Sequence, residues 1–317
     1  MPLNTHILAS PKCKHPLLPE NGGFRCAGSD CGRQYPVIDG RPILINEDNS
    51  VFALSDYQPP SHDPATPERP GLLQRFGRHV PLICRNWKGA ESFRNLRKLL
   101  QHRDTKRVLI VGAGERGVGI GALNSDPEIE LFRTDVYLEA KVDAVADAHD
   151  LPIQDDAFDA VVIQAVLEHV LDPQRCVDEI HRVLKPDGIV YSETPFLWPV
   201  HLGPYDFTRF SYSGHRRLFN RFHEIDSGMS AGPGVALALA TRGVFIGLSN
   251  SRLMSGFVTY ILPFLIFWMK HLDRFMLDKP EAADFGAAFY FMGKSAASAV
   301  PDEEILAYHW SRKQTPH

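Results

Sequence analysis

Glycines and a carboxylate at a characteristic spacing carry the first chemical signal of the chain. Residues 107–111 form a short apolar run, and Gly112, Ala113 and Gly114 follow it directly. Because glycine has no side chain, such a turn lets the backbone approach a ligand at the mouth of a sheet. Roughly twenty residues further on, Asp135 ends another short run, and a carboxylate at that spacing can accept both ribose hydroxyl protons of a nucleoside.

The elements that must position these residues alternate between strands and helices. Residues 108–111, 158–163 and 188–191 are short apolar runs of strand length, and polar or amphipathic stretches of helix length separate them. Repeated units of this kind predict a parallel sheet covered by helices. Asp147 would lie at the end of the third strand, where its carboxylate could accept a hydrogen bond from an exocyclic amine.

Five motifs occur between residues 105 and 200 in the order and spacing of one family. They are Gly112-Ala113-Gly114, Asp147-Ala148 with Leu151-Pro152, Phe158-Asp159, Leu167-Glu168-His169 and residues 182–188. Together they closely resemble class I S-adenosylmethionine-dependent methyltransferases of the type 11 group. The resemblance implies an α/β fold with a doubly wound, mostly parallel seven-stranded sheet that binds S-adenosyl-L-methionine over the carboxyl ends of its strands.

The resemblance also implies which residues contact the cofactor. By position, the methionine part would face Gly112, Ala113, Gly114 and Gln164, the ribose would face Asp135, and the adenine would lie between Asp147 and Ala148. One position departs from the family, which usually has an acid two residues before the first glycine. This chain has Ile110 there, so a non-catalytic relative that serves as a scaffold or activator remains an alternative.

Three cysteines near the N-terminus form a second chemical signal. Cys13, Cys26 and Cys31 lie in a segment that resembles the small zinc-ribbon proteins acting as methyltransferase activators. Structural zinc takes four tetrahedral ligands, but Ser10 occupies the position of the first expected cysteine, and His15 is the nearest candidate for the fourth ligand. The alternatives are one structural zinc, or a ribbon that has lost its metal and is held by hairpin packing.

The segment after the fifth strand, residues 193–210, is the candidate acceptor site. It is rich in aromatic residues and contains His201, Asp206 and Arg209. A hydroxyl acceptor needs a base, and an imidazole with a pKa near about 6.5 can serve. We therefore predict His201 as the catalytic base, with Asp206 orienting it or acting in its place. His169 is a second candidate, and a packed lid without catalytic residues is the alternative.

The remaining features restrict the acceptor. The Asn-Pro-Pro-aromatic motif of nucleobase amino-group methyltransferases is absent after the fourth strand, and the net charge is −4 with an isoelectric point near 6.4. Both observations argue against nucleic acid. The sequence predicts methyl transfer to an oxygen of a small molecule or glycan, with an RNA methyltransferase as the alternative.

Composition changes along the chain predict its domain organisation. Residues 1–45 form a degenerate zinc-ribbon-like module, 46–70 a proline-rich linker, and 71–295 the methyltransferase domain, with a tail at 296–317. The domain opens with a helical preamble at 71–105. An apolar insertion at about 229–282 separates the sixth strand, near residue 222, from the seventh, near residue 287.

The apolar insertion has two interpretations. It could be a helical pair that completes the core or forms a homodimer interface, or it could be a surface for a lipid-linked acceptor and peripheral membrane contact. The chain of 317 residues is 44% hydrophobic, which is typical of a globular protein. Its first residues lack the pattern of a signal peptide. We expect a cytoplasmic protein, with the inner membrane face as the alternative location.

Overall fold

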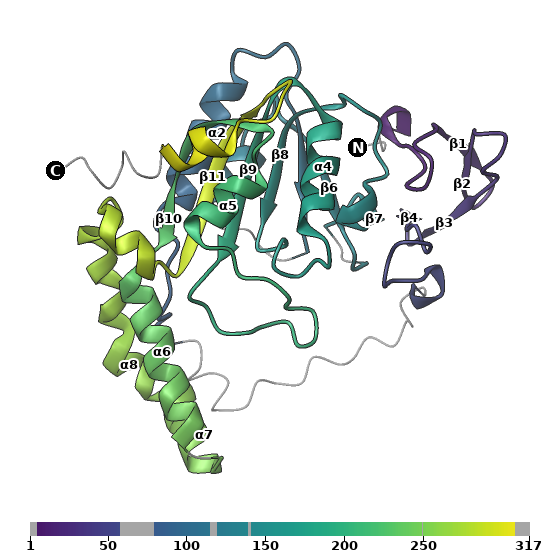
Figure 1. Ribbon diagram of the computed structural model, residues 1–317. Helices are drawn as coiled ribbons and strands as arrows, with labels where there is room; N and C mark the ends of the chain where they lie inside the picture. Colours follow the sequence, from purple (N-terminus) through teal and green to yellow (C-terminus); the bar gives the residue numbers. More distant parts are fainter. Residues whose placement is uncertain (1–4, 58–78, 115–118, 139–140, 249, 308–317) are drawn as a thin grey trace.

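The strands form one mixed sheet at the centre of the molecule (Figure 1). The computed structural model describes residues 5–57, 79–114, 119–138, 141–248 and 250–307. Within these ranges the strand order is β1-β2-β3-β4-β7-β6-β5-β8-β9-β11-β10. The bounds are β1 Leu17–Glu20, β2 Gly23–Cys26, β3 Gln34–Ile38, β4 Arg41–Leu44, β5 Arg107–Val111, β6 Glu130–Asp135, β7 Ala144–Ala146, β8 Phe158–Gln164, β9 Leu184–Pro195, β10 Phe222–Ala231 and β11 Ala288–Ser295.

The seven strands β7-β6-β5-β8-β9-β11-β10 confirm the predicted doubly wound α/β fold. The first five run parallel to one another, and β11 pairs antiparallel with both β9 and β10. The chain order reverses beside β5, which pairs with β6 on one side and β8 on the other. Ligands of open α/β sheets bind at such a switch point, beyond the carboxyl ends of the strands.

Helices cover both faces of the sheet because its strands are apolar on both faces. Along β5, Val108 and Ile110 pack with α2 (Gly89–Leu100) and α3 (Gly121–Asn124), while Leu109 and Val111 pack with α4 (Pro173–Val183) and α5 (Tyr212–Leu218). Alternate side chains of a strand point to opposite faces. A parallel strand that is buried on both faces therefore reads as a continuous apolar run.

The N-terminal strands extend the central sheet. Strand β4 pairs in parallel with β7, so that Ile43 is opposite Val145 and Leu44 is opposite Ala146. A bridge between Leu8 and Ile153 adds a further contact. The predicted boundary at residue 45 thus falls directly after a strand that belongs to the same sheet as the methyltransferase strands.

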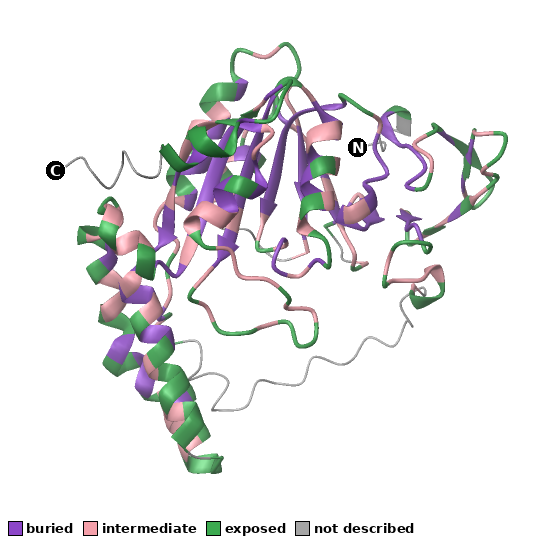
Figure 2. Cartoon of the chain, in the orientation of Figure 1, coloured by how far each residue is buried: buried purple, intermediate pink, exposed green. Residues whose placement is uncertain are grey.

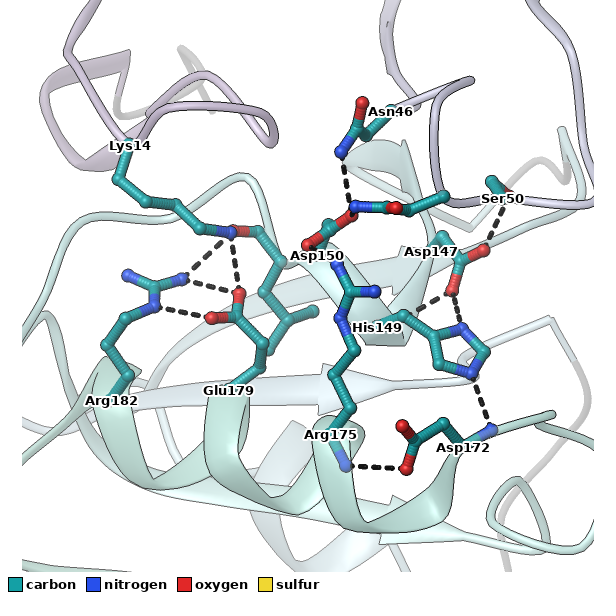
Figure 3. A network of polar contacts seen from close by, with 12 residues as sticks. Lys14, Asn46, Ser50, Asp147, His149, Asp150, Asp172, Arg175, Glu179 and Arg182 are labelled. Carbon is teal, nitrogen blue, oxygen red and sulfur yellow. Dashed lines mark hydrogen bonds and ion pairs between the residues drawn. The ribbon is translucent and has the colours of Figure 1, made fainter.

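Polar contacts also join the N-terminal segment to the helical face (Figure 3). The Lys14 ammonium lies 2.7 Å from a carboxylate oxygen of Glu179 on α4, and Arg182 bonds to the same carboxylate. The Asn46 amide donates to Asp150 at 2.8 Å. Asp150 belongs to a single 3-10 turn, η3 (Ala148–Asp150), that follows β7.

A helical hairpin between β10 and β11 projects away from the sheet (Figure 1). It consists of α6 (Pro233–Leu248), α7 (Arg252–Tyr260), α8 (Leu262–Ile266), η4 (Phe267–Phe275) and η5 (Pro280–Phe285). These helices lie where the sequence predicts an apolar insertion. Among the described helices, none alone has the length and hydropathy to cross a membrane, but α7 together with residues 262–275 passes that test as a pair bent by 44°.

Several predicted segments lie partly outside the described residues. These are positions 58–70 of the linker, 71–78 of the helical preamble, and the tail from 308 onward. Within the described part of the preamble, α2 is the helix, and residues 79–88 form bends and irregular chain. A single 3-10 turn, η2 (Leu54–Asp56), and η1 (Thr5–Ile7) complete the elements.

Candidate active site and cysteine cluster

The glycine turn follows β5 as the sequence predicts. Gly112 has a φ of 76°, and its amide donates to the carbonyl of Thr134 on β6 at 2.9 Å. A Cβ atom at this position would lie 2.2 Å from Cγ2 of Val166. Both the left-handed backbone and the close contact require glycine here. Gly112 therefore fixes the path of the turn at the carboxyl edge of the sheet.

Asp135 faces this turn from the end of β6. One of its carboxylate oxygens accepts a hydrogen bond from the Gly114 amide at 2.8 Å, and the other accepts from the Tyr137 amide at 3.0 Å. An ionised carboxylate has about four acceptor positions, so Asp135 can accept further hydrogen bonds from a ligand. These acceptor positions fit the hydroxyl groups of a ribose, with Gly112, Ala113 and Gly114 close by.

Both carboxylate oxygens of Asp147 form hydrogen bonds within the protein, which the sequence does not predict (Figure 3). One oxygen accepts from the Ser50 hydroxyl at 2.5 Å, and the other accepts from the amide of His149 at 3.0 Å and lies 2.6 Å from its Nδ1 atom. Although burial raises the pKa of Asp147, the bonds from His149 and Ser50 outweigh it and lower that pKa. Ala148, the other predicted adenine neighbour, is buried.

Gln164 ends β8 and takes part in a buried network that sequence reasoning missed. Its side chain bonds to Glu193 on β9, as does the Tyr191 hydroxyl. The Asn86 amide donates to both oxygens of the Glu193 carboxylate, at 2.9 and 2.8 Å. Burial raises the pKa of Glu193. Asn86 precedes α2 and is separated from Glu193 by over a hundred positions, so no local pattern points to this pair.

An aromatic group borders the same edge of the sheet. Phe52 stacks on Tyr205 with ring centroids 6.0 Å apart, and it meets the edge of Tyr137 at 6.3 Å. The Tyr57 hydroxyl donates to the carbonyl of Val136 at 2.8 Å. Phe52 and Tyr57 come from the segment that the sequence assigns to a linker. The sequence marks these two residues only as aromatic, and that does not predict which part of the fold they contact.

The loop after β9 brings His201 and Asp206 together. The backbone amide of His201 donates to Asp206 at 2.8 Å, and its Nδ1 atom lies 3.3 Å from the same carboxylate oxygen. The guanidinium of Arg209 pairs with both oxygens of Asp206, one of them at 2.6 Å. The Arg209 hydrogen bonds outweigh the opposing effect of burial and lower the pKa of Asp206 to about 2. Of the two predicted roles, this environment favours orientation of His201 over proton abstraction by Asp206.

His201 also faces a pair of residues that follow β8. Its Nε2 atom lies 3.2 Å from Nε2 of His169 and 3.8 Å from a carboxylate oxygen of Glu168. The Glu168 side chain has 0% exposure, and neither of its oxygens meets a hydrogen-bond donor from another residue that the structure describes. Burial raises the pKa of Glu168 to about 7 and lowers that of His169. In the sequence, Glu168 stands out only as part of a family motif.

The three N-terminal cysteines converge in space. The sulfur atoms of Cys13 and Cys26 are 3.3 Å apart, and those of Cys13, Cys26 and Cys31 all lie within 4.8 Å of one another. Ser10 is buried and shares a hydrogen bond of 2.9 Å with the Tyr35 hydroxyl. It therefore supports the cluster through Tyr35, although its hydroxyl also lies 3.8 Å from the Cys31 sulfur.

His15 lies beside this cluster, where a fourth ligand is needed. Its Nδ1 atom is 3.0 Å from the point that a Cβ atom of Gly28 would occupy, and both residues line the same cleft as Cys13 and Cys31. Hydrogen bonds from Ser10 and His15 outweigh the opposing effect of burial and lower the pKa of Cys13 to about 6. Three thiols and one imidazole are a donor set that structural zinc uses, so the cluster could hold that ion.

Comparison with known proteins identifies the central region. Residues 123–192 match the family model described as "Methyltransferase domain". The chain is 29% identical over 181 residues to "Arginine-hydroxylase NDUFAF5, mitochondrial" of Mus musculus, which covers 50% of this chain and 51% of that protein. It is 45% identical over 65 residues to "Demethylmenaquinone methyltransferase" of Clavibacter sepedonicus, which covers 20% of this chain and 26% of that protein.

The matches thus span about half and about a quarter of the length of these two relatives. Among solved structures, a phosphoethanolamine N-methyltransferase 2 of Haemonchus contortus is similar with a TM-score of 0.41 and 16% identity, over 66% of this chain and 53% of that one. The family match includes β6 and β8, which end at Asp135 and Gln164, and β7, which Asp147 directly follows. The chain therefore contains a region, residues 123–192, that matches the methyltransferase domain family, and its cysteine triad lies in a small N-terminal β module that resembles a zinc ribbon.

Proposed function

We propose that the protein transfers the methyl group of S-adenosylmethionine to an oxygen atom of a small molecule or glycan. The observation that supports this proposal is the cluster of Glu168, His169 and His201. It lies on the loops that follow β8 and β9, at the same sheet edge as the glycine turn after β5. Parallel strands gather their carboxyl ends at one edge, so these groups lie on the acceptor side of the predicted cofactor site.

Each group of residues would have its own role in the proposed methyl transfer. The cofactor, held by Gly112–Gly114 and Asp135, supplies a methyl group on a sulfonium sulfur. The hydroxyl proton of the acceptor passes to the histidine cluster, where His201 has the partly exposed side chain. Asp206 orients His201 through its backbone amide and ring. Alignment of the reacting atoms can supply about 7–11 kcal/mol of the barrier reduction.

Labelled cofactor and fractionated cell extract provide the test. The protein should place label on a small molecule or glycan, and His201→Asn should reduce turnover by about 10²–10⁴-fold while cofactor affinity in calorimetry stays nearly unchanged. His223→Asn, at an exposed position on β10, is the matched control. Label on RNA would favour the RNA alternative, absence of cofactor binding would favour a scaffold, and full turnover by His201→Asn would exclude that base.

We further propose that the N-terminal module holds one structural zinc through Cys13, Cys26, Cys31 and His15. The converging sulfur atoms and the adjacent imidazole support this. Metal analysis should find that Cys26→Ser removes one equivalent of zinc, and that Cys84→Ser, a change outside the cluster, removes none. Equal zinc content in the Cys26 variant and the parent protein would contradict the assignment.

We also propose that the helical hairpin contacts an anionic membrane surface, at the inner face of the cell membrane, and that the acceptor is lipid-linked. Exposed apolar side chains on the hairpin support this, and its sequence from 233 to 285 holds five Lys or Arg residues against four acids. One of these acids, Asp273, is buried, so basic residues are in excess among the other charges of the hairpin. Basic residues near apolar ones favour membranes with acidic lipids.

A further inference from the structure

Two histidines and a buried carboxylate point polar atoms at one another. The Nε2 atoms of His169 and His201 are 3.2 Å apart, and an oxygen of Glu168 lies 3.6 Å from the first and 3.8 Å from the second. The last two distances exceed a normal hydrogen bond. Three lone-pair atoms in such a triangle repel one another unless a proton or a metal cation lies between them.

In each of the two histidines, the hydrogen bond made by Nδ1 indicates which ring nitrogen carries the proton. Nδ1 of His169 bonds to the carbonyl oxygen of Tyr205, which can only accept, so this nitrogen carries the proton. Nδ1 of His201 lies 3.3 Å from the carbonyl oxygen of Pro199 and 3.3 Å from the ionised Asp206, which are also acceptors. In the neutral rings both Nε2 atoms therefore expose lone pairs. Histidine ligands of metals are typically oriented in this way.

Glu168 supplies an independent observation. Its side chain is fully buried, and among the described residues no donor from another side chain or backbone reaches either oxygen. Arg209 is the nearby cation, but it pairs with Asp206, and its Nε atom also has no partner in the described structure. A buried carboxylate without partners is costly, and a cation between the three groups would remove that cost.

We propose that Glu168, His169 and His201 bind one divalent transition-metal ion. A triangle with sides of 3.2, 3.6 and 3.8 Å has a circumradius of about 2.1 Å, which matches Zn–N and Zn–O bonds of about 2.0–2.2 Å. Two imidazoles and a carboxylate suit zinc, iron or manganese better than calcium or magnesium. The His201 side chain is 39% exposed, so a further ligand can reach an open coordination position.

The site would refine the acceptor chemistry, and this step rests on the proposed function. An acceptor hydroxyl at the open position would lose its proton to solvent more readily, because a bound metal lowers the pKa of an oxygen ligand. In that state His201 acts as a ligand, and the metal takes over the activation of the acceptor. Acceptors with hydroxyl groups that can reach a metal would then be favoured over amines.

Cobalt and zinc ions alone provide the probe. In the full chain with Cys13, Cys26 and Cys31 all replaced by Ser, Co²⁺ titration should show one equivalent bound without the thiolate charge-transfer absorption of a cysteine site. Glu168→Gln in that background should weaken binding at least tenfold, whereas His223→Gln, at an exposed position, should not. The proposal would be overturned if the triple-Ser protein bound no Co²⁺, or if Glu168→Gln left its Co²⁺ binding unchanged.

Two further readouts guard against misfolding and against confusion with the proposed function. With the cysteines intact, the wild-type protein should hold two zinc equivalents and the Glu168→Gln variant one. In the triple-Ser background, added zinc should raise the melting temperature, and Glu168→Gln should abolish that increase. Equal zinc content or equal thermal response would count against the site. Metal binding needs no acceptor, so a protein that binds the ion but transfers no methyl group would refute the proposed function alone.

Discussion

At the scale of single residues, the two acids of the candidate site differ in how much of their hydrogen-bonding capacity the protein itself satisfies. Asp135 accepts two backbone amides and retains acceptor capacity, whereas Asp147 is enclosed by Ser50 and His149. The two acids thus differ in what they can offer a ligand. Asp135 retains acceptor positions that a ligand can use, whereas Asp147 links Ser50 of the N-terminal segment to His149 after β7.

Asp135→Ala should weaken S-adenosylmethionine binding by at least tenfold. Hydrogen bonds to a charged acceptor contribute about 1.5–3 kcal/mol each, and the ribose would lose two. Titration calorimetry measures the effect, and thermal melting checks that the protein stays folded. Glu130→Gln, at the opposite end of β6, is the control and should bind normally. Unchanged affinity in the Asp135 variant would remove this residue from the site.

His215 should make stability depend on acidity. The ring is fully buried beside the Ser192 hydroxyl, and burial lowers its pKa to about 3. The unfolded chain, with a His pKa near about 6.5, takes up a proton that the folded chain refuses, so the free energy of unfolding falls as the pH drops from about 6.5 toward 3.

Between pH 7 and pH 5 the His215 contribution amounts to about 2 kcal/mol. His215→Gln has no proton to gain, so its free energy of unfolding should fall by about that much less than the wild-type value over the same interval. Urea denaturation at both pH values measures the difference. Parallel decreases in the two proteins would show that His215 is protonated in the folded state.

At the scale of elements, local patterns predict strands well and their partners poorly. The runs at 108–111, 158–163 and 188–191 lie within β5, β8 and β9, because strands buried on both faces need continuous apolar residues. The pairing of β4 with β7 was not predicted, since Ile43 and Val145 are about a hundred positions apart. The predicted residues Gly114 and Asp135 are in contact, but the proximity of Glu168 to His201 depends on loop geometry that no spacing reveals.

Asp273 should control the junction between the hairpin and the sheet. Its carboxylate accepts the amides of Gly232 at 2.9 Å and Gly234 at 2.6 Å, at the start of α6. Asp273→Ala would leave two buried amides unpaired and remove a helix cap, which costs about 1–3 kcal/mol. Chemical denaturation should show this loss, whereas Asp278→Ala, with an exposed side chain, should change stability little. Equal stability of both variants would contradict the capping role.

At the scale of the whole molecule, the burial pattern separates the sheet from the hairpin (Figure 2). The sheet is buried between two helical layers, but the hairpin is largely exposed despite its apolar sequence. Its exposed apolar residues include Leu237, Val244, Ile246, Leu248, Leu253, Ile261, Phe264, Leu265, Phe267, Trp268 and Phe275. A helix that is apolar on all sides belongs in a protein core or in a membrane, and the described part of the chain provides no core for this surface.

Vesicle binding should therefore depend on the hairpin. Wild-type protein should sediment with vesicles of phosphatidylcholine and phosphatidylglycerol, and less with phosphatidylcholine alone, because basic residues outnumber the acids of the hairpin once the buried Asp273 is set aside. Leu248→Glu with Leu253→Glu removes two side chains that are 67% and 88% exposed. Full burial of each leucine contributes about 1.5–3 kcal/mol, so the double variant should bind about a hundredfold more weakly or worse. Leu18→Glu, at an exposed position on β1, should bind normally. If the double variant instead binds vesicles like wild type but changes a dimer to a monomer in light scattering, the hairpin pairs with a second copy of the chain and the acceptor need not be lipid-linked.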